Sequence, residues 1–255
     1  MNDPTLNSVL DPIYSEEDFA LIDPKLVPHH IAIIMDGNRR WAKKYGHPFE
    51  VGHWQGSERL DCIVRAAAEL GIKVVTTYAF STENWGRPQE EVDMLMQILE
   101  AYLINKRERL VKEGVRLHAI GDLSKLPEGI VDAMQDTLEA TEKCDKIDLV
   151  IAVNYGGRDE ICRAVTKIVE KIETGALKKE DITRDLIADH LDTAKWPDPD
   201  LVIRTSGENR MSNFLTWQAA YSEILVTDVL WPEFSDTNLL QAVLEFQKRN
   251  RRFGE

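Results

Sequence analysis

The chain has 255 residues, of which 43% are hydrophobic and 29% are charged, and its formal net charge is −13. This length can bury the core of one large α/β domain or two small ones, and the acidic balance argues against a broad nucleic-acid surface. No stretch is long and apolar enough to span a bilayer. The cysteines Cys62, Cys144 and Cys162 form no C-x-x-C pair, so we expect free thiols and a cytoplasmic location.

Residues 1–27 carry prolines among acidic residues and contain no apolar core. We therefore expect a loose N-terminal extension that is not a signal peptide, followed by a single domain over residues 28–255. Within the extension, Ser15 is placed to cap one short helical turn in the segment SEEDFALI.

Apolar runs alternate with amphipathic helical patterns from residue 28 onward, and no repeat or linker divides them. Several runs are apolar on both sides of the pleat, which is typical of a sheet covered by helices on both faces. The sequence therefore predicts an α/β domain with a mostly parallel six-stranded sheet. The predicted strands are Ile31–Met35, Val74–Phe80, Val115–Ile120, Leu149–Val153, Leu201–Arg204 and Ile224–Val229. The predicted helices are Ser57–Leu70, Pro88–Glu113, Pro127–Lys143, Asp159–Lys171, Thr183–Leu191 and Asp236–Arg249.

The first apolar run ends in DGNRRW, at the carboxyl end of a strand, where ligands of such sheets bind. Gly37 permits a tight turn, and a helix that starts near Asn38 would present free N–H groups to a phosphate. Arg39 and Arg40 supply forked donors for the same group. Asp36 would repel a phosphate unless a divalent cation bridges the two, so it is a candidate Mg²⁺ ligand. Taken alone, Asp36 is equally well explained as a helix N-cap.

The second strand is followed by STENWGRP, a segment dense in polar groups that a plain loop would also explain. It contains Ser81, Glu83, Asn84, Trp85 and Arg87.

The long helix after it carries Val92, Leu95, Met96, Leu99 and Leu103 at helical spacing. This stripe predicts either a core-facing side or the wall of an apolar cavity.

The fourth strand is followed by NYGGRDE, which is only a weak phosphate-loop signal. The fifth strand is followed by a short loop with two guanidiniums and a hydroxyl, from Arg204, Arg210 and Ser212. This set suits a second diphosphate, and Glu208 is placed to orient one of the arginines. Two anionic headgroups at one edge of the sheet are the simplest explanation of these strand ends.

Several of these segments resemble the signature blocks of the cis-prenyltransferases, and the closest resemblance is to the bacterial undecaprenyl diphosphate synthases. The blocks are HIAIIMDGNRRWAK, GH at Gly52-His53, YAFSTENWGRPQEEV, NYGGRDEI, DPDLVIRTSGENRMSNFLTWQAAYSE and RRFG. They occur in the family's order over about residues 29–254.

The resemblance implies an enzyme that condenses an allylic diphosphate, usually farnesyl diphosphate, with successive isopentenyl diphosphates. It implies cis double bonds, dependence on Mg²⁺, a homodimer and an apolar tunnel for the growing chain. The expected product is undecaprenyl diphosphate, a lipid carrier for cell-wall synthesis. Chain length and peripheral membrane contact for product release stay open, and a short- or medium-chain product is the alternative.

The resemblance also assigns roles to single residues. Asp36 is implied as the Mg²⁺ ligand and a catalytic residue, and Glu223 as an acid that reaches the metal from the dimer partner. The allylic diphosphate is assigned to Gly37, Asn38, Arg39, Arg40, Trp41 and His53. Isopentenyl diphosphate is assigned to Arg204, Arg210 and Ser212, and to a mobile loop with Ser81, Glu83, Asn84 as a second catalytic residue, Trp85 and Arg87. The motif Arg252-Phe253-Gly254 is implied to cross the dimer.

One departure from the family pattern concerns the allylic site. The family usually has an arginine four positions before the histidine of GH, and this chain has Phe49 there. Loss of one charged hydrogen bond costs about 1.5–3 kcal/mol. Arg39, where many relatives have glycine, is the candidate to compensate.

Two other classes of protein fit the sequence less well. A nucleotide-binding hydrolase is disfavoured because the chain has neither G-x-x-x-x-G-K-[ST] nor G-x-G-x-x-G. A non-catalytic partner subunit would typically lose the catalytic acid and the diphosphate arginines, which this chain keeps. The general base is not identified: Asp36, Asn38 acting through water, and released diphosphate are all compatible with the sequence.

Overall fold

The computed structural model describes residues 12–249 of the chain. A six-stranded sheet lies at its centre in the order β3-β4-β2-β1-β5-β6, and each neighbouring pair of strands is parallel. The predicted α/β domain and parallel sheet are therefore confirmed. The strands are β1 His30–Ile34, β2 Val74–Ser81, β3 Val115–Ile120, β4 Ile147–Tyr155, β5 Leu201–Arg204 and β6 Glu223–Val226.

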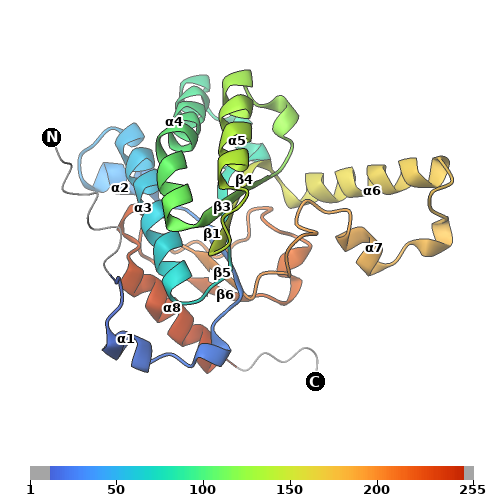
Figure 1. Cartoon of the computed structure of the whole chain (residues 1–255). Coiled ribbons are helices and arrows are strands. Elements are labelled where there is room, and N and C mark those ends of the chain that lie inside the picture. The colour runs from blue at the N-terminus through green and yellow to red at the C-terminus, as the bar shows by residue number, and fades with distance from the viewer. Residues whose placement is uncertain (1–11, 250–255) are drawn as a thin grey trace.

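Helices α3, α4, α5 and α8 pack on one face of the sheet, whereas α6 and α7 form an arm that projects from the body (Figure 1). The helices of the described residues are α1 Glu16–Ala20, α2 Asn38–Lys44, α3 Phe49–Glu69, α4 Gln89–Glu113, α5 Glu128–Thr141, α6 Gly157–Glu173, α7 Arg184–Ala188 and α8 Asp236–Lys248. A short 3₁₀ helix, η4 (Thr82–Gly86), links β2 to α4.

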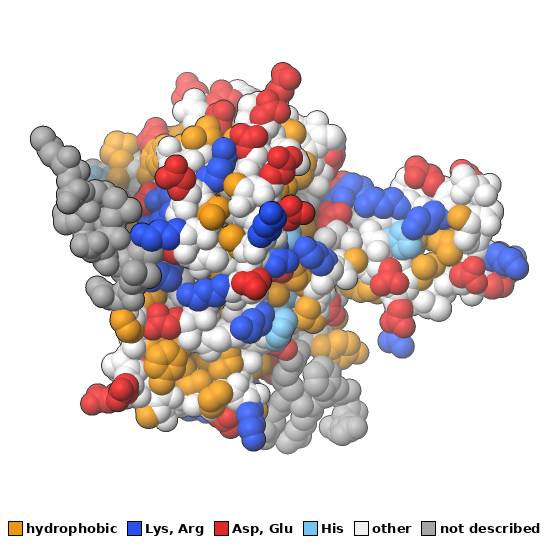
Figure 2. Space-filling view, viewed as in Figure 1, with side chains coloured by type: hydrophobic (Ala, Val, Ile, Leu, Met, Phe, Trp, Pro, Cys, Tyr) orange, Lys and Arg blue, Asp and Glu red, His pale blue; other side chains and the backbone are white. Residues whose placement is uncertain are grey.

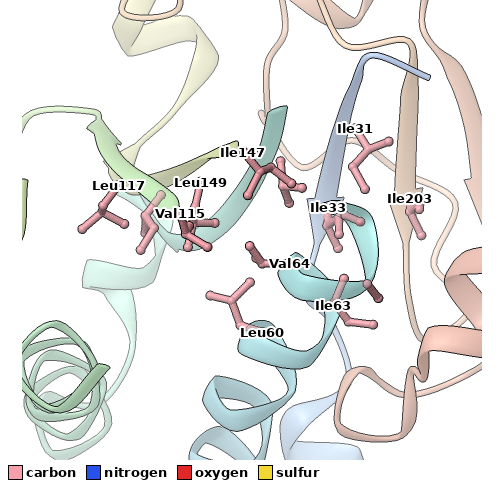
Figure 3. Close-up of a cluster of buried hydrophobic side chains, with 14 of the residues drawn as sticks. Ile31, Ile33, Leu60, Ile63, Val64, Val115, Leu117, Ile147, Leu149 and Ile203 are labelled. Atoms are coloured by element: carbon pink, nitrogen blue, oxygen red, sulfur yellow. The ribbon is translucent and has the colours of Figure 1, made fainter. Parts of the chain in front are cut away.

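The two faces of the sheet are covered differently. The larger core lies under α3, α4, α5 and α8, and Figure 3 shows Leu60, Ile63 and Val64 of α3 facing the strands. The smaller cluster on the other face uses loop residues, chiefly Phe214 and Leu215, against the strands. On the second face, the chain after β5 supplies much of the cover.

Helix α3 begins at Phe49 and not at the predicted Ser57, and the reason lies in two glycines. Gly52 and Gly56 lower intrinsic helix propensity, which hid the first turns from sequence reasoning. Both are needed for close packing: a Cβ at Gly52 would lie 2.2 Å from the backbone oxygen of Asn38, and one at Gly56 would lie 2.5 Å from its side-chain oxygen. The glycines thus let α3 press against the start of α2.

Residues 12–27 pack against the body of the domain. Helix α1 has the predicted Ser15 cap, which forms a capping box with Asp18. The Tyr14 hydroxyl donates to the backbone oxygen of Asp236 at 3.0 Å, and the Glu69 carboxylate accepts the backbone N–H of Ile13 at 2.9 Å. The domain boundary after residue 27 stays a prediction, and residues 1–11 lie outside the described part of the chain.

The three cysteines are free thiols, as predicted. Across residues 12–249, no helix combines the length and the apolarity that a membrane crossing requires. On the face shown in Figure 2, basic and acidic side chains are interspersed, including on the α6–α7 arm.

A buried histidine at the start of β1 makes stability depend on pH. His30 donates from Nδ1 to the backbone oxygen of Pro197 at 2.7 Å, and its Nε2 accepts from the Thr76 hydroxyl at 2.8 Å. Burial lowers the pKa of His30 to about 4, although the Pro197 hydrogen bond opposes the shift. The unfolded histidine has a pKa near 6.5, so its contribution is complete above that pH and is lost as the pH falls toward 4.

We expect His30 alone to remove about 2 kcal/mol of unfolding free energy between pH 7 and pH 5. Urea unfolding of the wild type and of His30→Gln at both pH values measures this, and the variant should lose about 2 kcal/mol less than the wild type. An equal loss in both proteins would contradict the role of His30.

Candidate active site

A polar cleft opens where β1, β2 and β5 end, with a volume of about 670 Å³, which is in the usual range for ligand pockets. Because the strands are parallel, their carboxyl ends meet at one edge, and the predicted residues after them are brought together there. The predicted residues that line the cleft are Asp36, Asn38, His53, Ser81, Glu83, Asn84, Arg87, Arg204, Arg210 and Ser212.

The turn from β1 into α2 depends on Gly37. This residue has φ of 110°, and a Cβ on it would lie 3.0 Å from the Leu230 side chain and 3.1 Å from Ser206. The tight turn lets α2 begin at Asn38, as expected. No side chain caps α2, so its first N–H groups, which lack intrahelical partners, are left for another acceptor.

Asp36 and Arg204 form the central contact of the cleft. Arg204 donates from Nη2 to Asp36 Oδ2 at 2.9 Å, and Arg40 Nη2 lies 3.5 Å from Asp36 Oδ1. Burial alone would raise the pKa of Asp36, but the Arg204 hydrogen bond and the charges of both arginines outweigh it, so the pKa lies below its ordinary value. Asp36 is therefore an anion at neutral pH.

Arg204 is held by the loop that follows its own strand. Its side chain is only 6% exposed, and its Nη1 donates to the Ser212 hydroxyl at 2.8 Å and to the backbone oxygen of Arg210. The loop has positive φ at Ser206, Ser212, Asn213 and Leu215. Such strain in non-glycine residues clusters at functional sites, and here it keeps the three predicted residues of the second diphosphate site together.

Glu208 pairs with arginines from both predicted sites, as expected of an orienting acid. Its Oε2 lies 2.5 Å from Arg210 Nη1, and its Oε1 lies 3.6 Å from Arg40 Nη2. Arg40 also donates from Nη1 to the backbone oxygen of Ser206 at 2.8 Å. Ser206 was not predicted, and only its position two residues after Arg204 could have drawn attention to it.

Glu91, in the first turn of α4, is a second residue that sequence reasoning missed. Its side chain is 4% exposed and accepts from Arg39 Nη1 at 3.2 Å and from Arg87 Nη1 at 2.8 Å. Arg39 also lies over the Phe49 ring, with its guanidinium carbon 5.8 Å from the ring centroid. The i,i+4 spacing from Arg87 was the only available signal, because the contact with Arg39 joins distant segments.

His53 and Asn38 carry unsatisfied polar atoms at the bottom of the cleft. His53 Nε2 and Asn38 Oδ1 are buried and have no hydrogen-bond partner. Burial and the charge of Arg87 lower the pKa of His53 to about 4, so its ring is neutral at pH 7. Unpaired buried polar groups are uncommon and call for an explanation, and a bound ligand at this point would supply one.

The loop after β2 is more ordered than a plain loop. Asn84 accepts from the Ser81 backbone N–H at 3.1 Å, and Glu83 accepts from Asn213 at 2.9 Å. The Trp85 indole donates to Asn154 at 2.8 Å and does not line the cleft. The predicted residues of this loop therefore divide into those that face the cleft and one, Trp85, that anchors the loop from behind.

Further predicted residues fall outside the cleft. Gly37, Arg39 and Arg40 do not line it, and Arg39 and Arg40 line a separate hollow together with Phe49. Trp41 packs against Tyr45 and His47 and lines no part of it. Glu223 starts β6, level with Leu201, so it lies at the opposite edge of the sheet and pairs with Arg249 at 3.0 Å. Its predicted metal role would have to be played in a partner's site. The motif at residues 252–254 lies outside the described residues.

Asp36 is the carboxylate best placed to help hold a divalent cation. Within residues 12–249, no three His, Cys, Asp or Glu side chains converge as a metal site. Mg²⁺ commonly binds through one or two protein carboxylates, substrate phosphates and water. The anionic Asp36 meets that requirement only together with a phosphate ligand.

A second hollow, here called the apolar cavity, continues from the cleft between α3 and α4 and measures about 100 Å³. Met35, Asn38, His53, Ala79 and Leu95 line both spaces. Of the two isoleucines of β4, Ile151 lines the apolar cavity, whereas Ile147 belongs to the packed core. The deeper walls are Leu60, Phe80, Met96, Ile98, Leu99, Tyr102, Ile151 and Trp231.

Comparisons with known proteins agree with this arrangement. A family model described as putative undecaprenyl diphosphate synthase matches residues 34–254. The isoprenyl transferase of Clostridium perfringens is 46% identical over 93% of this chain and 94% of its own length. The isoprenyl transferase of Bacillus subtilis is 48% identical over 94% of this chain and 92% of its own.

Two solved structures share the fold. Lavandulyl diphosphate synthase from Lavandula x intermedia, in complex with dimethylallyl diphosphate, has a TM-score of 0.88 at 40% identity and covers 91% of this chain and 100% of its own. A probable undecaprenyl diphosphate synthase from Campylobacter jejuni has a TM-score of 0.76 at 33% identity over 89% of this chain and 99% of its own.

The contacts of Arg39 sharpen the hypothesis that it replaces the arginine absent at Phe49. Arg39→Ala should weaken binding of farnesyl diphosphate at least about tenfold, or about 1.4 kcal/mol, because the guanidinium beside Phe49 is lost. Isothermal titration measures the dissociation constant. Lys112→Ala, an exposed cation in the last turn of α4, is the control and should change it little. A near-normal constant in the Arg39 variant would reject the compensation.

Proposed function

Because the chain belongs to the undecaprenyl diphosphate synthase family and is an enzyme of the cis-prenyltransferase type, we propose that it condenses farnesyl diphosphate with successive isopentenyl diphosphates. The proposed product is undecaprenyl diphosphate, which would serve as a lipid carrier for cell-wall synthesis. The proposed enzyme is a Mg²⁺-dependent homodimer.

The observation that carries the proposal is the contact between Asp36 and Arg204. Asp36 follows β1 and Arg204 ends β5, so the contact joins the two strand ends to which the two headgroups were assigned. Arg40 lies 3.5 Å from Asp36, and Arg210 and Ser212 contact Arg204, so two neighbouring sets of donors meet at this ion pair. Such an arrangement suits two diphosphates whose hydrocarbon parts must meet.

The first chemical task is to break the allylic carbon–oxygen bond, which leaves negative charge on the departing diphosphate. In the proposed mechanism, the first N–H groups of α2, the Arg40 guanidinium and the neutral His53 ring would stabilise that charge. Donors aimed at developing charge are typically worth about 10²–10³ each in rate. Mg²⁺ held by Asp36 and the phosphate oxygens would add Lewis-acid neutralisation of the same charge.

The second task is to aim isopentenyl diphosphate at the allylic carbon. Arg204, Arg210 and Ser212 would hold its headgroup, and the fixed distance between the strand ends supplies the orientation. The terminal alkene carbon then bonds to the allylic carbon, which leaves a carbocation on the isopentenyl unit. A proton is lost from the carbon next to that cation, and the new double bond forms. The lowered pKa of Asp36 makes it a weak base, which favours released diphosphate, or water held by Asn38, as the acceptor of that proton.

The apolar cavity takes the hydrocarbon tail. Burial contributes about 0.8 kcal/mol per CH₂, so each added unit is drawn away from the cleft between α3 and α4. After each addition the product carries the diphosphate of the added isopentenyl unit. The released diphosphate would therefore have to leave, and the new headgroup would have to move from the Arg204 donors to those around Arg40, before the next addition. A long product leaves most easily into a bilayer, so we propose peripheral contact with a membrane at product release.

The dimer part of the proposal concerns Glu223. Within one chain this acid lies at the far edge of the sheet, so a role at the metal requires a second copy. We propose that Glu223 of each chain serves the site of the other, as the family resemblance implies.

A short-chain product is the second candidate, and two observations favour it. The apolar cavity is small, at about 100 Å³, and the structure resembles lavandulyl diphosphate synthase, which was solved with dimethylallyl diphosphate. Incubation of the pure protein with farnesyl or dimethylallyl diphosphate, labelled isopentenyl diphosphate and Mg²⁺, followed by sizing of the products, distinguishes the two. Products of eleven isoprene units support the first candidate, and no labelled product from either primer would refute both.

Asp36→Ala tests the centre of the site. Its condensation rate should fall at least about 100-fold, because the charge that positions Arg204 and the metal ligand are both removed. Asp132→Ala, an exposed carboxylate on α5, is the control and should keep the wild-type rate. Circular dichroism shows whether the fold is intact, and a folded Asp36 variant within about tenfold of wild type would reject the role.

A further inference from the structure

The proposed isopentenyl diphosphate site is divided between two segments that follow different strands. Arg204, Arg210 and Ser212 belong to the end of β5 and the loop after it, whereas the other cleft-lining residues assigned to this substrate lie in the segment 81–87 after β2. Strands β2 and β5 are not neighbours, because β1 lies between them in the sheet. Direct pairing of their strands therefore does not fix the two loops relative to each other.

Asn213 connects the two loops through its side chain. Its Nδ2 donates to Glu83 Oε1 at 2.9 Å, a contact here called the loop bridge. Its backbone has φ of 63°, a left-handed conformation that asparagine adopts more readily than most residues. Burial alone would raise the pKa of Glu83, but its hydrogen bonds, with that from Asn213 foremost, lower the pKa below its ordinary value. Glu83 is therefore an anion at neutral pH, and the loop bridge is a charge-assisted hydrogen bond.

Asn213 is itself held by the first turn of α6. Its backbone oxygen accepts from the Gly157 N–H at 2.7 Å, and its Oδ1 accepts from the Arg158 N–H at 2.9 Å. No side chain at the N-cap position of α6, Gly156, provides an acceptor, so Asn213 provides from another segment what an N-cap residue normally supplies. Asn213 is thereby fixed to a helix of 17 residues that runs from the body into the arm (Figure 1).

The segment NYGGRDE has a structural explanation in these contacts. A Cβ at Gly156 would lie 2.6 Å from Thr82 Oγ1 and 2.7 Å from Asn213 Nδ2, and a Cβ at Gly157 would overlap the side chain of Thr216. The two glycines therefore let the start of α6 approach the loop after β2 and the loop after β5 at once. The first N–H groups of α6 are occupied by Asn213, so the motif serves the packing of the site.

We propose that Asn213 is a positioning residue that joins the loop after β2 to the loop after β5 on the first turn of α6. The loop bridge keeps Glu83 and its neighbours in one position relative to Ser212 and Arg204, so that both loops meet the same ligand. The inference rests on the proposed function, because isopentenyl diphosphate is the ligand that the two loops would share.

Hydrogen exchange of the ligand-free protein tests the loop bridge directly. Asn213→Asp keeps the oxygen acceptors for α6, but it replaces the donor to Glu83 with a second carboxylate, which repels the first. Exchange in residues 81–87 should become at least about tenfold faster, since the loop opens more often, whereas exchange in the first turn of α6 should stay unchanged. Asn213→Ala removes both side-chain contacts and should speed exchange in both segments.

Glu83→Gln supplies the rescue. Alone it keeps the loop bridge, because the glutamine oxygen still accepts from Asn213, and exchange in residues 81–87 should stay slow. Combined with Asn213→Asp it restores a hydrogen bond with the donor reversed, since the glutamine Nε2 can donate to the new carboxylate. Exchange in residues 81–87 of this double variant should return to near the wild-type rate.

Asn105→Asp is the matched control, because it adds the same charge at an exposed position of α4 that does not line the cleft. It should leave exchange in residues 81–87 unchanged. Wild-type exchange there in Asn213→Asp, or no recovery in the double variant, would overturn the loop bridge.

Steady-state kinetics tests whether the loop bridge serves the substrate. Asn213→Asp should raise the KM for isopentenyl diphosphate about tenfold and that for farnesyl diphosphate less than about threefold. Because an added negative charge alone weakens diphosphate binding, the test is the coupling between the two substitutions. The double variant should recover the KM for isopentenyl diphosphate at least about threefold beyond the product of the two single effects. A double variant that equals this product would overturn the role in substrate binding.

The two measurements separate this inference from the proposed function. A wild type that makes no prenyl product would refute the proposed function, and the exchange data would still decide whether Asn213 joins the loops. An active wild type whose variants show no coupling would refute the inference alone.

Discussion

The organisation of this protein depends on one ion pair, between the half-exposed Asp36 and the buried Arg204. A buried guanidinium is tolerated only when it is paired, and Asp36 provides the charge that permits Arg204 at the end of β5. The two strands are neighbours in the sheet, with Ile34 level with Arg204, so the register of backbone hydrogen bonds fixes where the charges meet. The spacing of the two proposed headgroup sites is thus set by the register of β1 and β5 and not by the surface loops.

Much of this could be read from the sequence because parallel strands are buried on both faces and end abruptly. The apolar runs gave six strands close to their observed bounds, and the charges after them gave Asp36, Arg204, Arg210 and Ser212, which the sheet edge brings together. What failed had physical causes. The start of α3 was not predicted because Gly52 and Gly56 weaken the helical pattern, although they are needed for close packing against Asn38. Glu91 was missed because its partner Arg39 comes from another segment.

The electrostatics of the cleft are balanced before any ligand arrives. Asp36, Glu91 and Glu208 neutralise arginines from both sides of the cleft, which explains how a chain of net charge −13 keeps several guanidiniums close together. A diphosphate must compete with these carboxylates for the same donors. Since surface pairs contribute little, Arg39 and Arg210 can exchange partners easily, whereas Arg204, 6% exposed, is held in place.

The junction between the polar cleft and the apolar cavity explains why two unpaired polar atoms survive there. His53 and Asn38 line both spaces, so a headgroup above them and a hydrocarbon tail below would meet at this level. A charged imidazolium beside the hydrocarbon tail would lose its hydration, which costs free energy. Because the pKa of His53 is lowered, its ring is neutral at pH 7 and this cost does not arise. The neutral His53 ring can still donate one hydrogen bond to a headgroup in the polar cleft. His53 and Asn38 thus mark the boundary between the charged headgroup and the hydrocarbon tail. Helices α3 and α4 wall the apolar cavity on the hydrocarbon side of this boundary.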